Sequence, residues 1–284
     1  RWAADGSYIV FYTTMKAKKD DRGIHRLTTP RDRWPNFRNR TVLHMLDLTS
    51  GQQMQLTSSD VSTSLYAIHP NNNTILIGQT SDDFANRPYT KTDLKLLNLA
   101  DLSVEDVTSV SWIAQAVWSP DGKRLAVTGG PRLFGDIGVN VRDGQIPNDY
   151  DGQVYLYDIA SKNATALTRT FNPSVNSMKW RDNKNLLLNV MEGEYQPLYN
   201  YNLRSQVFRK MNGGADVIGA FDVSSDGNTA VYFGSGVKSP GKAYVMELKK
   251  NKSNLLHFPA RSEFRNTTFG DVKDFRFKNS RGDN

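Results

Sequence analysis

The sequence predicts an all-β protein, a β-propeller made of four-stranded antiparallel blades. Four short apolar stretches separated by turn residues follow one another between Ala116 and Thr168 and would form one such blade. The same pattern recurs four more times along the 284 residues, which is typical of repeat architectures. With 38% hydrophobic residues, the chain has enough apolar surface for stacked blades. It contains no run of about eighteen apolar residues, so no membrane-spanning helix is expected.

The central blade begins with a tight hairpin. Residues 116–119 ("AVWS") and 123–128 ("KRLAVT") are predicted strands. Pro120, Asp121 and Gly122 lie between them and supply a fixed φ, a side-chain cap and a residue that tolerates positive φ. Residues 154–159 and 164–168 are predicted as the third and fourth strands of this blade.

The five blades are predicted at residues 1–57, 64–108, 116–168, 177–211 and 218–259. The strongest internal match joins "LHMLDLTSGQQMQLT" in the first blade with "VYLYDIASKNATALT" in the third. The first turn of each blade is marked in chain order by Gly6, Asn73, Gly122, Asn183 and Gly227. The spacing varies from 44 residues between the last two landmarks to 67 between the first two. A regular motif at irregular spacing indicates loops inserted into a constant scaffold.

Long inserts connect the second and third strands of the predicted blades. In an up-and-down blade, the connections between strands one and two and between strands three and four share one face, and here they are short. The inserts are predicted at 16–40, 79–93 and 129–151 in the first three blades, and shorter ones at 191–197 and 234–241 in the last two. They are therefore expected on the opposite face. A partner, a substrate or a second domain is expected to meet the propeller there.

The end of the chain is predicted as a strand that leads out of the propeller. This strand would cover residues 272–277, which divides the chain into blades at 1–270 and an exit segment at 271–284. Five blades and one strand do not close a ring, and exposed sheet edges are unfavourable. Further chain is therefore expected at one or both ends.

The net charge of +7 is concentrated in the insert of the first blade. Residues 16–40 contain nine basic and three acidic residues. With Trp34 and Phe37, this insert could pair phosphates and stack bases, but no nucleic-acid-binding module surrounds it. We expect instead a solvated loop whose two aromatic side chains pack on the blade beneath, and no nucleic-acid partner.

No catalytic or metal-binding motif is recognisable. The chain lacks a GxSxG nucleophile elbow, a GxxxxGK phosphate loop and any cysteine. Asp149 and Asp151 fall at ligand positions of a calcium loop, but its first ligand and its final glutamate are missing. Four single histidines are expected to pack or to lie on the surface: His25, His44, His69 and His257. We expect no cofactor and no metal.

Several segments resemble the propeller of the prolyl oligopeptidase family, especially its acylaminoacyl-peptidase and dipeptidyl-aminopeptidase-like bacterial members. They are "VWSPDGKRLAV" at 117–127, "GEYQPLYNYNL" at 193–203 and "DFRFKNSRGDN" at 274–284. Residues 33–52 resemble the family's first-blade pattern, which gives a structural role to Trp34, Phe37, Arg40 and His44. TolB-like propellers share the "SPDG" repeats, so the second and third segments are the ones that favour the peptidase family.

The resemblance implies that this chain is the N-terminal propeller portion of a two-domain serine peptidase. The catalytic serine, aspartate and histidine of the family lie in an α/β-hydrolase domain that would follow in the same polypeptide, so this chain alone is not expected to be an enzyme. In the family, the propeller covers the active site and restricts access to short or unfolded peptide substrates. The resemblance also implies a periplasmic or otherwise extracytoplasmic bacterial location.

Residues that line a substrate path are expected in the insert of the third blade, because of its length and its face. The candidates are Arg132, Asp136, Asp149 and Asp151. The acidic motif "DWVYEEE", with which dipeptidyl peptidases grip a substrate N-terminus, has no match, and Glu192 and Glu194 are expected to be solvated loop acids. A dipeptide-releasing specificity is therefore not expected.

Two other functions fit the same repeats. A stand-alone TolB-like propeller would dock a protein partner through its long-loop face and would have no hydrolase domain. A carbohydrate-active five-bladed propeller would need carboxylates that converge on the axis from the innermost strands. The innermost strands in the last three blades read "QAVWS", "NSMKW" and "GAFDV", and they offer only Asp222.

Overall fold

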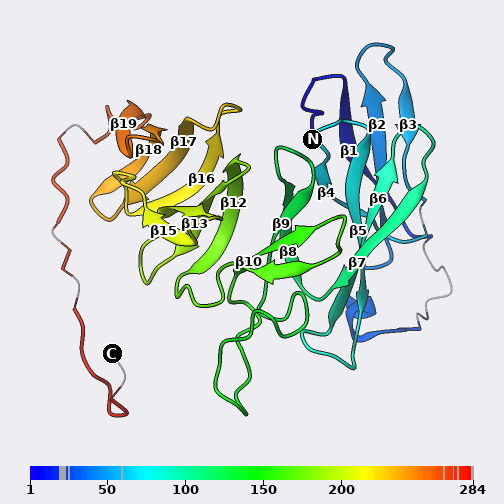
Figure 1. Ribbon diagram of the computed structural model, residues 1–284, viewed down its shortest axis with the longest axis horizontal. Helices are drawn as coiled ribbons and strands as arrows, with labels where there is room; N and C mark the ends of the chain where they lie inside the picture. Colours follow the sequence, from blue (N-terminus) through cyan, green and yellow to red (C-terminus); the bar gives the residue numbers. More distant parts are fainter. Residues whose placement is uncertain are drawn as a thin grey trace. The chain divides into compact units, whose positions relative to one another are not determined.

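The computed structural model describes residues 1–18, 24, 26–58, 60–264, 266–270, 272–273 and 275–282. This part of the chain contains nineteen strands and one 3-10 helix, and the strands form five sheets. The chain divides into two compact units, unit 1 at residues 1–172 and unit 2 at residues 173–284. Unit 1 runs from blue to green and unit 2 from yellow-green to red in Figure 1. The sheets are numbered here as blades 1 to 5 in chain order, and they confirm the predicted all-β propeller fold.

Unit 1 contains blades 1 to 3. Blade 1 consists of β1 (Tyr8–Met15), β2 (Arg40–Asp47) and β3 (Gln53–Gln55). Blade 2 consists of β4 (Ser64–Ile68), β5 (Thr74–Asp82), β6 (Thr90–Asn98) and β7 (Val104–Val110). Blade 3 consists of β8 (Ile113–Trp118), β9 (Arg124–Gly129), β10 (Gln153–Asp158) and β11 (Ala164–Ala166). Strands that are consecutive in sequence are neighbours in each sheet.

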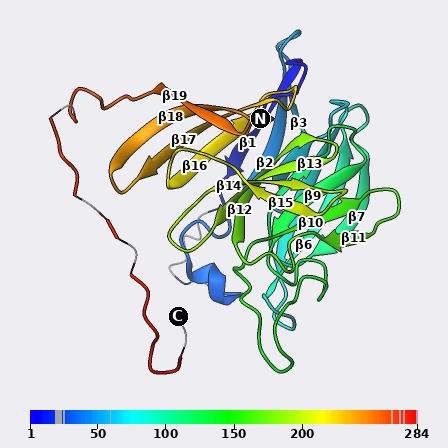
Figure 2. The same ribbon diagram turned by 60° about the vertical axis from the view of Figure 1, so that its left-hand side comes forward.

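Unit 2 contains blades 4 and 5, with the same up-and-down order. Blade 4 consists of β12 (Ser174–Asp182), β13 (Asn185–Met191), β14 (Leu198–Asn202) and β15 (Val207–Lys210). Blade 5 consists of β16 (Val217–Val223), β17 (Thr229–Gly236), β18 (Ser239–Glu247) and β19 (Lys252–His257). Figure 2 shows the four strands of blade 5 side by side in chain order.

The repeated turn forms as its sequence predicts. In blade 3 the Ser119 hydroxyl donates to Asp121 Oδ1 at 2.5 Å, the Gly122 N–H donates to the Ser119 carbonyl at 2.8 Å, and Gly122 has φ +69°. In blade 5, Ser224 bonds Asp226 in the same way at 2.6 Å, and Gly227 has φ +68°. Glycine favours this turn because it adopts positive φ without a Cβ penalty.

Blade 1 differs from the prediction, because its sheet has three strands instead of four. Ahead of β1, Asp5 Oδ1 accepts bonds from the N–H and hydroxyl of Ser7 and closes a turn. Before this turn the expected innermost strand is reduced to one β-bridge, between Trp2 and Ile9. One bridge does not make a ladder, so no strand forms at this position.

The inserts of blades 2 and 5 are shorter than predicted. The β5–β6 ladder continues to the pair Asp82 and Thr90, so the loop of blade 2 covers residues 83–89 instead of 79–93. Polar pairs extend the hairpin, such as the hydroxyls of Thr80 and Thr92 at 2.9 Å. In blade 5, most of the predicted insert 234–241 belongs to β17 and β18. Polar composition alone did not distinguish a solvated ladder from a loop.

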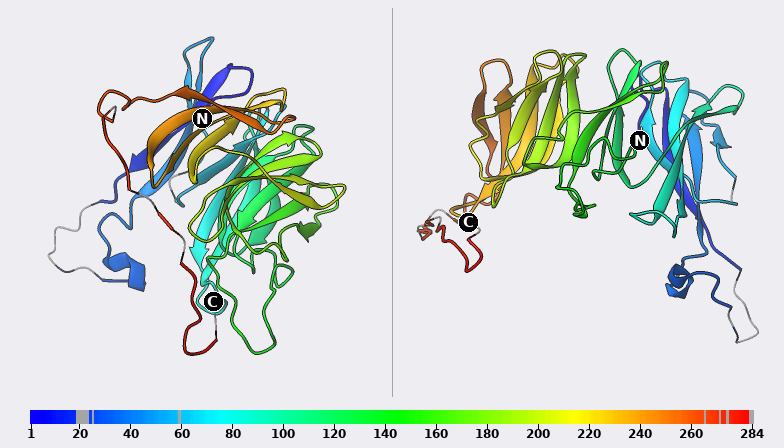
Figure 3. Two further views of the ribbon diagram at one scale, coloured as in Figure 1. Left: turned by 90° about the vertical axis from the view of Figure 1, so that its left-hand side faces the viewer. Right: turned by 60° about the horizontal axis from the view of Figure 1, so that its bottom comes forward.

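Alternating apolar side chains pack the blades face to face. In β5, Ile75 and Ile77 lie in one buried cluster with Val10 of blade 1, while Leu76 lies in a second cluster with Val127 of blade 3. This follows from the two-residue period of a strand whose two faces are both buried. Blades 4 and 5 share an equivalent cluster in unit 2. Figure 3 shows the stacked sheets of each unit. The connecting loops therefore begin and end in packed strands.

The predicted exit strand does not form in the part of residues 272–277 that the structure describes. Val272, Lys273 and residues 275–277 have no strand assignment. An extended segment becomes a strand only when a neighbour completes its ladder. The division of the chain into blades at 1–270 and an exit segment at 271–284 stays a prediction.

Candidate functional site on the long-loop face

The inserts of unit 1 leave the blades at one end, which is called the long-loop face here. Figures 1 and 3 show the blade 1 insert, with helix η1 (Pro30–Arg33), and the blade 3 insert at the same end of this unit. Arg31 in the blade 1 insert forms an ion pair with Asp82, where the blade 2 insert begins. The predicted shared face of the long inserts therefore exists within unit 1.

The blade 1 insert is organised around a buried carboxylate. Asp32 in η1 is 5% exposed. The guanidinium of Arg38 binds both of its oxygens, from Nε at 2.8 Å and from Nη2 at 2.7 Å. The N–H and the hydroxyl of Thr28 also donate to Oδ2, at 3.0 and 3.1 Å. These bonds stabilise the ionised form, so the pKa of Asp32 lies below its usual value. A fixed internal ion pair orders this loop.

The aromatic residues of the same insert do not both pack on the blade. Phe37 is half-buried, whereas Trp34 is 60% exposed and lies under the guanidinium of Arg33 at 5.3 Å. The packing predicted for Trp34 is wrong, because the turn between η1 and β2 directs it outward. Four charged residues counted in the basic insert lie outside the described part of the chain: Lys19, Asp20, Asp21 and Arg22.

The blade 3 insert is anchored by two apolar residues. The side chain of Leu133 is 1% exposed and belongs to the cluster between blades 2 and 3. Phe134 contacts Tyr155 and Tyr157 of β10, with ring centroids 5.5 and 5.6 Å apart. The hydroxyl of Ser111 donates to the Arg132 carbonyl at 3.1 Å and ties the insert to the end of blade 2. This short segment is therefore a firm support for the side chains beside it.

Arg132 and Asp136 lie on either side of this anchor and form an ion pair. Arg132 Nε is 3.3 Å from Asp136 Oδ1. Both residues line a cavity of about 420 Å³ with Asn86 and Arg87 of the blade 2 insert and Ser111. The structure therefore brings two of the four predicted path residues together, and it adds residues from a second insert.

The other two predicted path residues lie elsewhere on the same insert. Asp151 lines a separate cavity of about 380 Å³, together with Gln153 and Arg169. Gln153 is buried, and its amide donates to the Gly138 carbonyl at 3.0 Å. Asp149 lines neither cavity, and its Oδ1 is buried without a hydrogen-bond partner among the described residues. The four predicted residues do not form a single site.

The long-loop face of unit 1 exposes large apolar and aromatic side chains. Among the described residues of these inserts, five are at least 60% exposed: Ile24, Trp34, Phe84, Ile146 and Tyr150. In the short turns that follow β2 and β6, Leu48 and Leu102 are exposed only to 40% and 38%. Exposed apolar groups that gather on one face indicate a surface that contacts another molecule.

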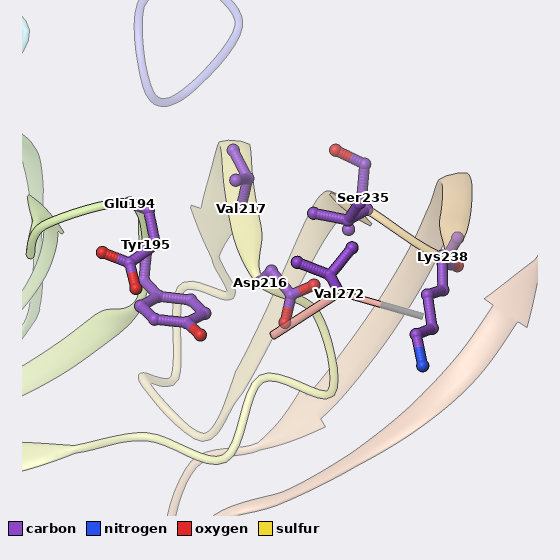
Figure 4. A pocket seen from close by; sticks show the side chains of 10 residues that line it. Glu194, Tyr195, Asp216, Val217, Ser235, Lys238 and Val272 are labelled. Atoms are coloured by element: carbon purple, nitrogen blue, oxygen red, sulfur yellow. The ribbon is translucent and has the colours of Figure 1, made fainter. Parts of the chain in front are cut away.

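Unit 2 has its own cavity, of about 390 Å³. Figure 4 shows Glu194 and Tyr195, from the blade 4 insert, near Asp216 and Val272, with Lys238 on the opposite side. The Gln196 N–H donates a hydrogen bond to the Asp216 carbonyl at 2.9 Å, which joins the main chain of the blade 4 insert to the segment before β16. Charges of both signs line this cavity.

Glu192 is not the solvated loop acid that was predicted. It is half-buried, accepts a hydrogen bond from the Tyr199 hydroxyl at 2.8 Å and pairs with Lys210 Nζ at 2.5 Å. The bond from Lys210 is the main reason that the pKa of Glu192 lies below its usual value. Burial, followed by the Glu192 carboxylate, raises the pKa of Tyr199 to about 12. Glu194 is exposed, as predicted.

Two of the histidines and the inner carboxylate have structural partners. His44 Nε2 lies 2.8 Å from the Thr13 hydroxyl, and His69 packs on Trp118. His25 lies outside the described residues. Asp222, the carboxylate of the inner strands, pairs with Lys179 at 3.0 Å.

In the described part of the chain, no group of three or more histidine and acidic side chains could hold a metal ion. No helix in the same residues is long and apolar enough to cross a bilayer.

Sequence reasoning missed the residues that complete the Arg132 cavity. Asn86 and Arg87 lie in the blade 2 insert, which joins the same two strands as the blade 3 insert. Inserts at equivalent positions of adjacent blades lie next to one another, so charged residues of both inserts can line the same cavity. Ser111 gave no comparable signal, because it follows β7 in an ordinary connection.

The sequence matches no known protein family and no curated protein. Similar solved structures include the acylaminoacyl peptidase of Pyrococcus horikoshii, with a TM-score of 0.69, 16% identity, and coverage of 98% of this chain and 41% of that one. TolB from Acinetobacter baumannii has a TM-score of 0.54 and 17% identity, and the match covers 76% of this chain and 48% of TolB. An oligogalacturonate lyase in complex with manganese has a TM-score of 0.57 and 12% identity, and the match covers 75% of this chain and 58% of the lyase.

These similarities define the class of the chain as a β-propeller domain. The identities lie between 12% and 17%, so they establish a shared fold and nothing further. This chain spans less than half of the length of the peptidase and of TolB. The names of the peptidase and of the lyase denote different reactions on related scaffolds, so function has to be argued from the loops.

Proposed function

We propose that this chain is the non-catalytic β-propeller of a two-domain serine peptidase of the prolyl oligopeptidase family. It would cover the active site of an α/β-hydrolase domain in the same polypeptide and admit short peptides. The segments at 117–127, 193–203 and 274–284, which resemble that family, support this proposal. The fold similarity to an acylaminoacyl peptidase over nearly the whole chain supports it further.

The observation that carries the proposal is the exposure of aromatic side chains on the long-loop face. Phe84 is 63% and Tyr150 is 80% exposed, on inserts that are held by buried anchors such as Leu133. Ordered loops that expose aromatic rings match the enrichment of these side chains in protein interfaces. A hydrolase domain on this face would cover them, and the inserts would then border the route to its active site.

Within this proposal, the charged residues of the blade 3 insert line the route. Arg132 and Asp136 border one cavity, Asp151 borders another, and Asp149 lies between them in sequence. A narrow route between ordered loops admits an extended peptide and excludes a folded protein. The function of these residues would be selection of substrates by size and charge.

The proposal is tested on the parent protein from its native source. A tetrapeptide, a dodecapeptide and an unfolded protein are compared as substrates, before and after alanine replacement of Arg132, Asp136, Asp149 and Asp151. We expect the ratio of kcat/KM between long and short substrates to change about tenfold, a difference of about 1.4 kcal/mol in barrier. A control with Lys123→Ala and Lys162→Ala, in the short turns, should keep the original ratio. An unchanged ratio in the quadruple variant would contradict the gating function.

A second candidate is a stand-alone TolB-like propeller that binds a protein partner. The exposed aromatic face favours it as much as it favours a hydrolase domain, because both surfaces would be covered by protein. The two candidates differ in the size of the intact polypeptide and in whether it carries a reactive serine.

A further inference from the structure

The cavity between the inserts of blades 2 and 3 is the strongest remaining candidate for a ligand site. Its volume is about 420 Å³, and its charged lining consists of Arg87, Arg132 and Asp136. Two guanidinium groups and one carboxylate give this lining a net charge of +1. The cavity lies on the face that exposes the aromatic side chains.

The backbone of Arg132 is held in place, and its guanidinium forms one side-chain contact among the described residues. The backbone of Arg132 is fixed by the bond from Ser111 and by the buried neighbour Leu133. Within the described residues, its side-chain contact with Asp136 uses Nε. The Asp136 side chain is 81% exposed, and exposed ion pairs are weak. The two terminal nitrogens of Arg132 are therefore available to an incoming anion.

Arg87 supplies the second cation. Its guanidinium lies over the ring of Tyr89 at 5.6 Å, and it forms no ion pair with any residue that the structure describes. An arginine on an aromatic ring keeps its edge free for donation, because the ring contacts its face. The edge of Arg87 can therefore take part in binding from the opposite insert.

We propose that this cavity binds a carboxylate group of a peptide, between Arg87 and Arg132. Planar guanidinium groups match carboxylates through paired N–H donors. The Asp136 carboxylate inside the lining lowers its net charge to +1, which suits a singly charged carboxylate better than a doubly charged phosphate. Asn86 and Ser111 border the cavity, but their side-chain donors are already bonded to Asp83 and to the Arg132 carbonyl.

Exposed apolar residues close in sequence to the cavity lining define the ligand further. Tyr89 follows Arg87 by two residues and Ile137 follows Asp136 directly, and they are 46% and 40% exposed. They would contact an apolar side chain adjacent to the bound carboxylate. The inference rests on the proposed function in taking the ligand to be a peptide. Binding by the 284-residue chain itself requires no hydrolase domain, so the two proposals can fail separately.

Calorimetric titration of the 284-residue chain tests the site. The probes are acetylated, amidated tetrapeptides with the sequences Ala-Phe-Ala-Glu and Ala-Phe-Ala-Gln, and the Gln peptide with a free C-terminal carboxylate. We expect at least one carboxylate peptide to bind about tenfold more tightly than the amidated Gln peptide, as for a charge-assisted hydrogen bond. The carboxylate that is preferred identifies whether the site accepts a side chain or a C-terminus.

Variants locate the binding within the cavity. Arg87→Gln and Arg132→Gln should each abolish the preference for the carboxylate, and Arg132→Lys should keep part of it because the charge remains without the planar fork. Arg142→Gln is the matched control, since Arg142 is exposed on the blade 3 insert and does not line the cavity. Thermal unfolding of each variant shows that it is folded. Equal binding of all three peptides, a preference that survives both Gln variants, or tighter binding of a phosphoserine peptide would overturn the proposal.

Discussion

One hydrogen bond between His69 and Gly122 joins blade 2 to blade 3. Nε2 of His69 lies 3.0 Å from the Gly122 carbonyl oxygen. Nδ1 accepts the N–H of Asn71 at 3.1 Å, so Nε2 is the nitrogen that carries the hydrogen and donates it. The same ring packs edge-on against Trp118, with centroids 4.5 Å apart. The first turns of two blades are thereby fixed to each other.

Equivalent bonds join the first turns of other blades. The Tyr8 hydroxyl donates to the Asn72 carbonyl at 2.9 Å, which joins blade 1 to blade 2. Arg181 Nε donates to the Gly227 carbonyl at 2.8 Å, which joins blade 4 to blade 5. The donor side chains differ, but the acceptor is always a carbonyl of the next turn. Within each unit, the short turns of neighbouring blades are therefore fixed to one another.

Replacement of His69 should loosen unit 1. His69→Ala removes the donor to Gly122 and the contact with Trp118, and we expect a loss of about 1 to 3 kcal/mol in the free energy of unfolding. Urea denaturation monitored by tryptophan fluorescence measures this loss. His257→Ala, on the exposed strand β19, should change the stability by less than about 0.5 kcal/mol. Equal effects of the two substitutions would contradict the linking function of His69.

Gly227 should tolerate no side chain. Its φ is +68°, and a Cβ would overlap the Arg181 carbonyl. Gly193, in the same unit, has φ +61° with open space around the Cβ position. Gly193→Ala should cost about 1 kcal/mol from backbone strain alone, and Gly227→Ala should cost at least about 2 kcal/mol more because the blades must separate. Chemical denaturation of both variants checks this difference, and equal losses would refute the contact.

The ion pair between Asp32 and Arg38 should keep the blade 1 insert ordered at neutral pH, and this effect should be lost in acid. The folded-state pKa of Asp32 lies below its usual value of 3.8. The pair therefore contributes its full stabilisation above that pH and loses it as the pH falls toward the lowered pKa. Asp32→Asn should imitate the acid state at neutral pH and increase tryptic cleavage after Arg31, Arg33 and Arg38. Asp143→Asn is the control on another insert, and resistance of the Asp32 variant equal to this control would contradict the prediction.

The Glu192 carboxylate should influence the ionisation of Tyr199. Burial is the largest cause of the raised pKa of Tyr199, and the bond and charge of Glu192 follow. Glu192→Gln should therefore lower that pKa from about 12 toward, but not to, the usual 10. NMR titration of ring carbons measures it. Glu194→Gln, two residues away, should leave it unchanged, and a similar fall in both variants would show that the pair is not specific.

The scaffold could be predicted from the sequence because its rules are local. The "SPDG" turn of blade 3 and the "SSDG" turn of blade 5 both combine a capping hydroxyl with a glycine at positive φ. The continuous apolar run at residues 75–77 lies in a predicted blade, and its side chains pack on both faces of the sheet. The strand order follows because consecutive short hairpins allow only neighbours to pair.

The site could be predicted only in part, because it depends on contacts between separate inserts. Arg132 and Asp136 were found from the length of one loop, but their neighbour Arg87 belongs to another blade. Glu192 was read as a loop acid, because its partner Lys210 is eighteen residues away across a ladder. The outward direction of Trp34 depends on a turn whose path its sequence does not specify.

The peptidase proposal is tested most directly on the protein from its native source, by intact mass and by labelling with a serine-reactive fluorophosphonate. We expect a polypeptide about twice the 32.0 kDa of this chain, in line with the 41% share of the similar peptidase, with one labelled serine outside residues 1–284. An unlabelled protein of little more than 32.0 kDa would contradict the peptidase function and would leave a propeller that binds a partner.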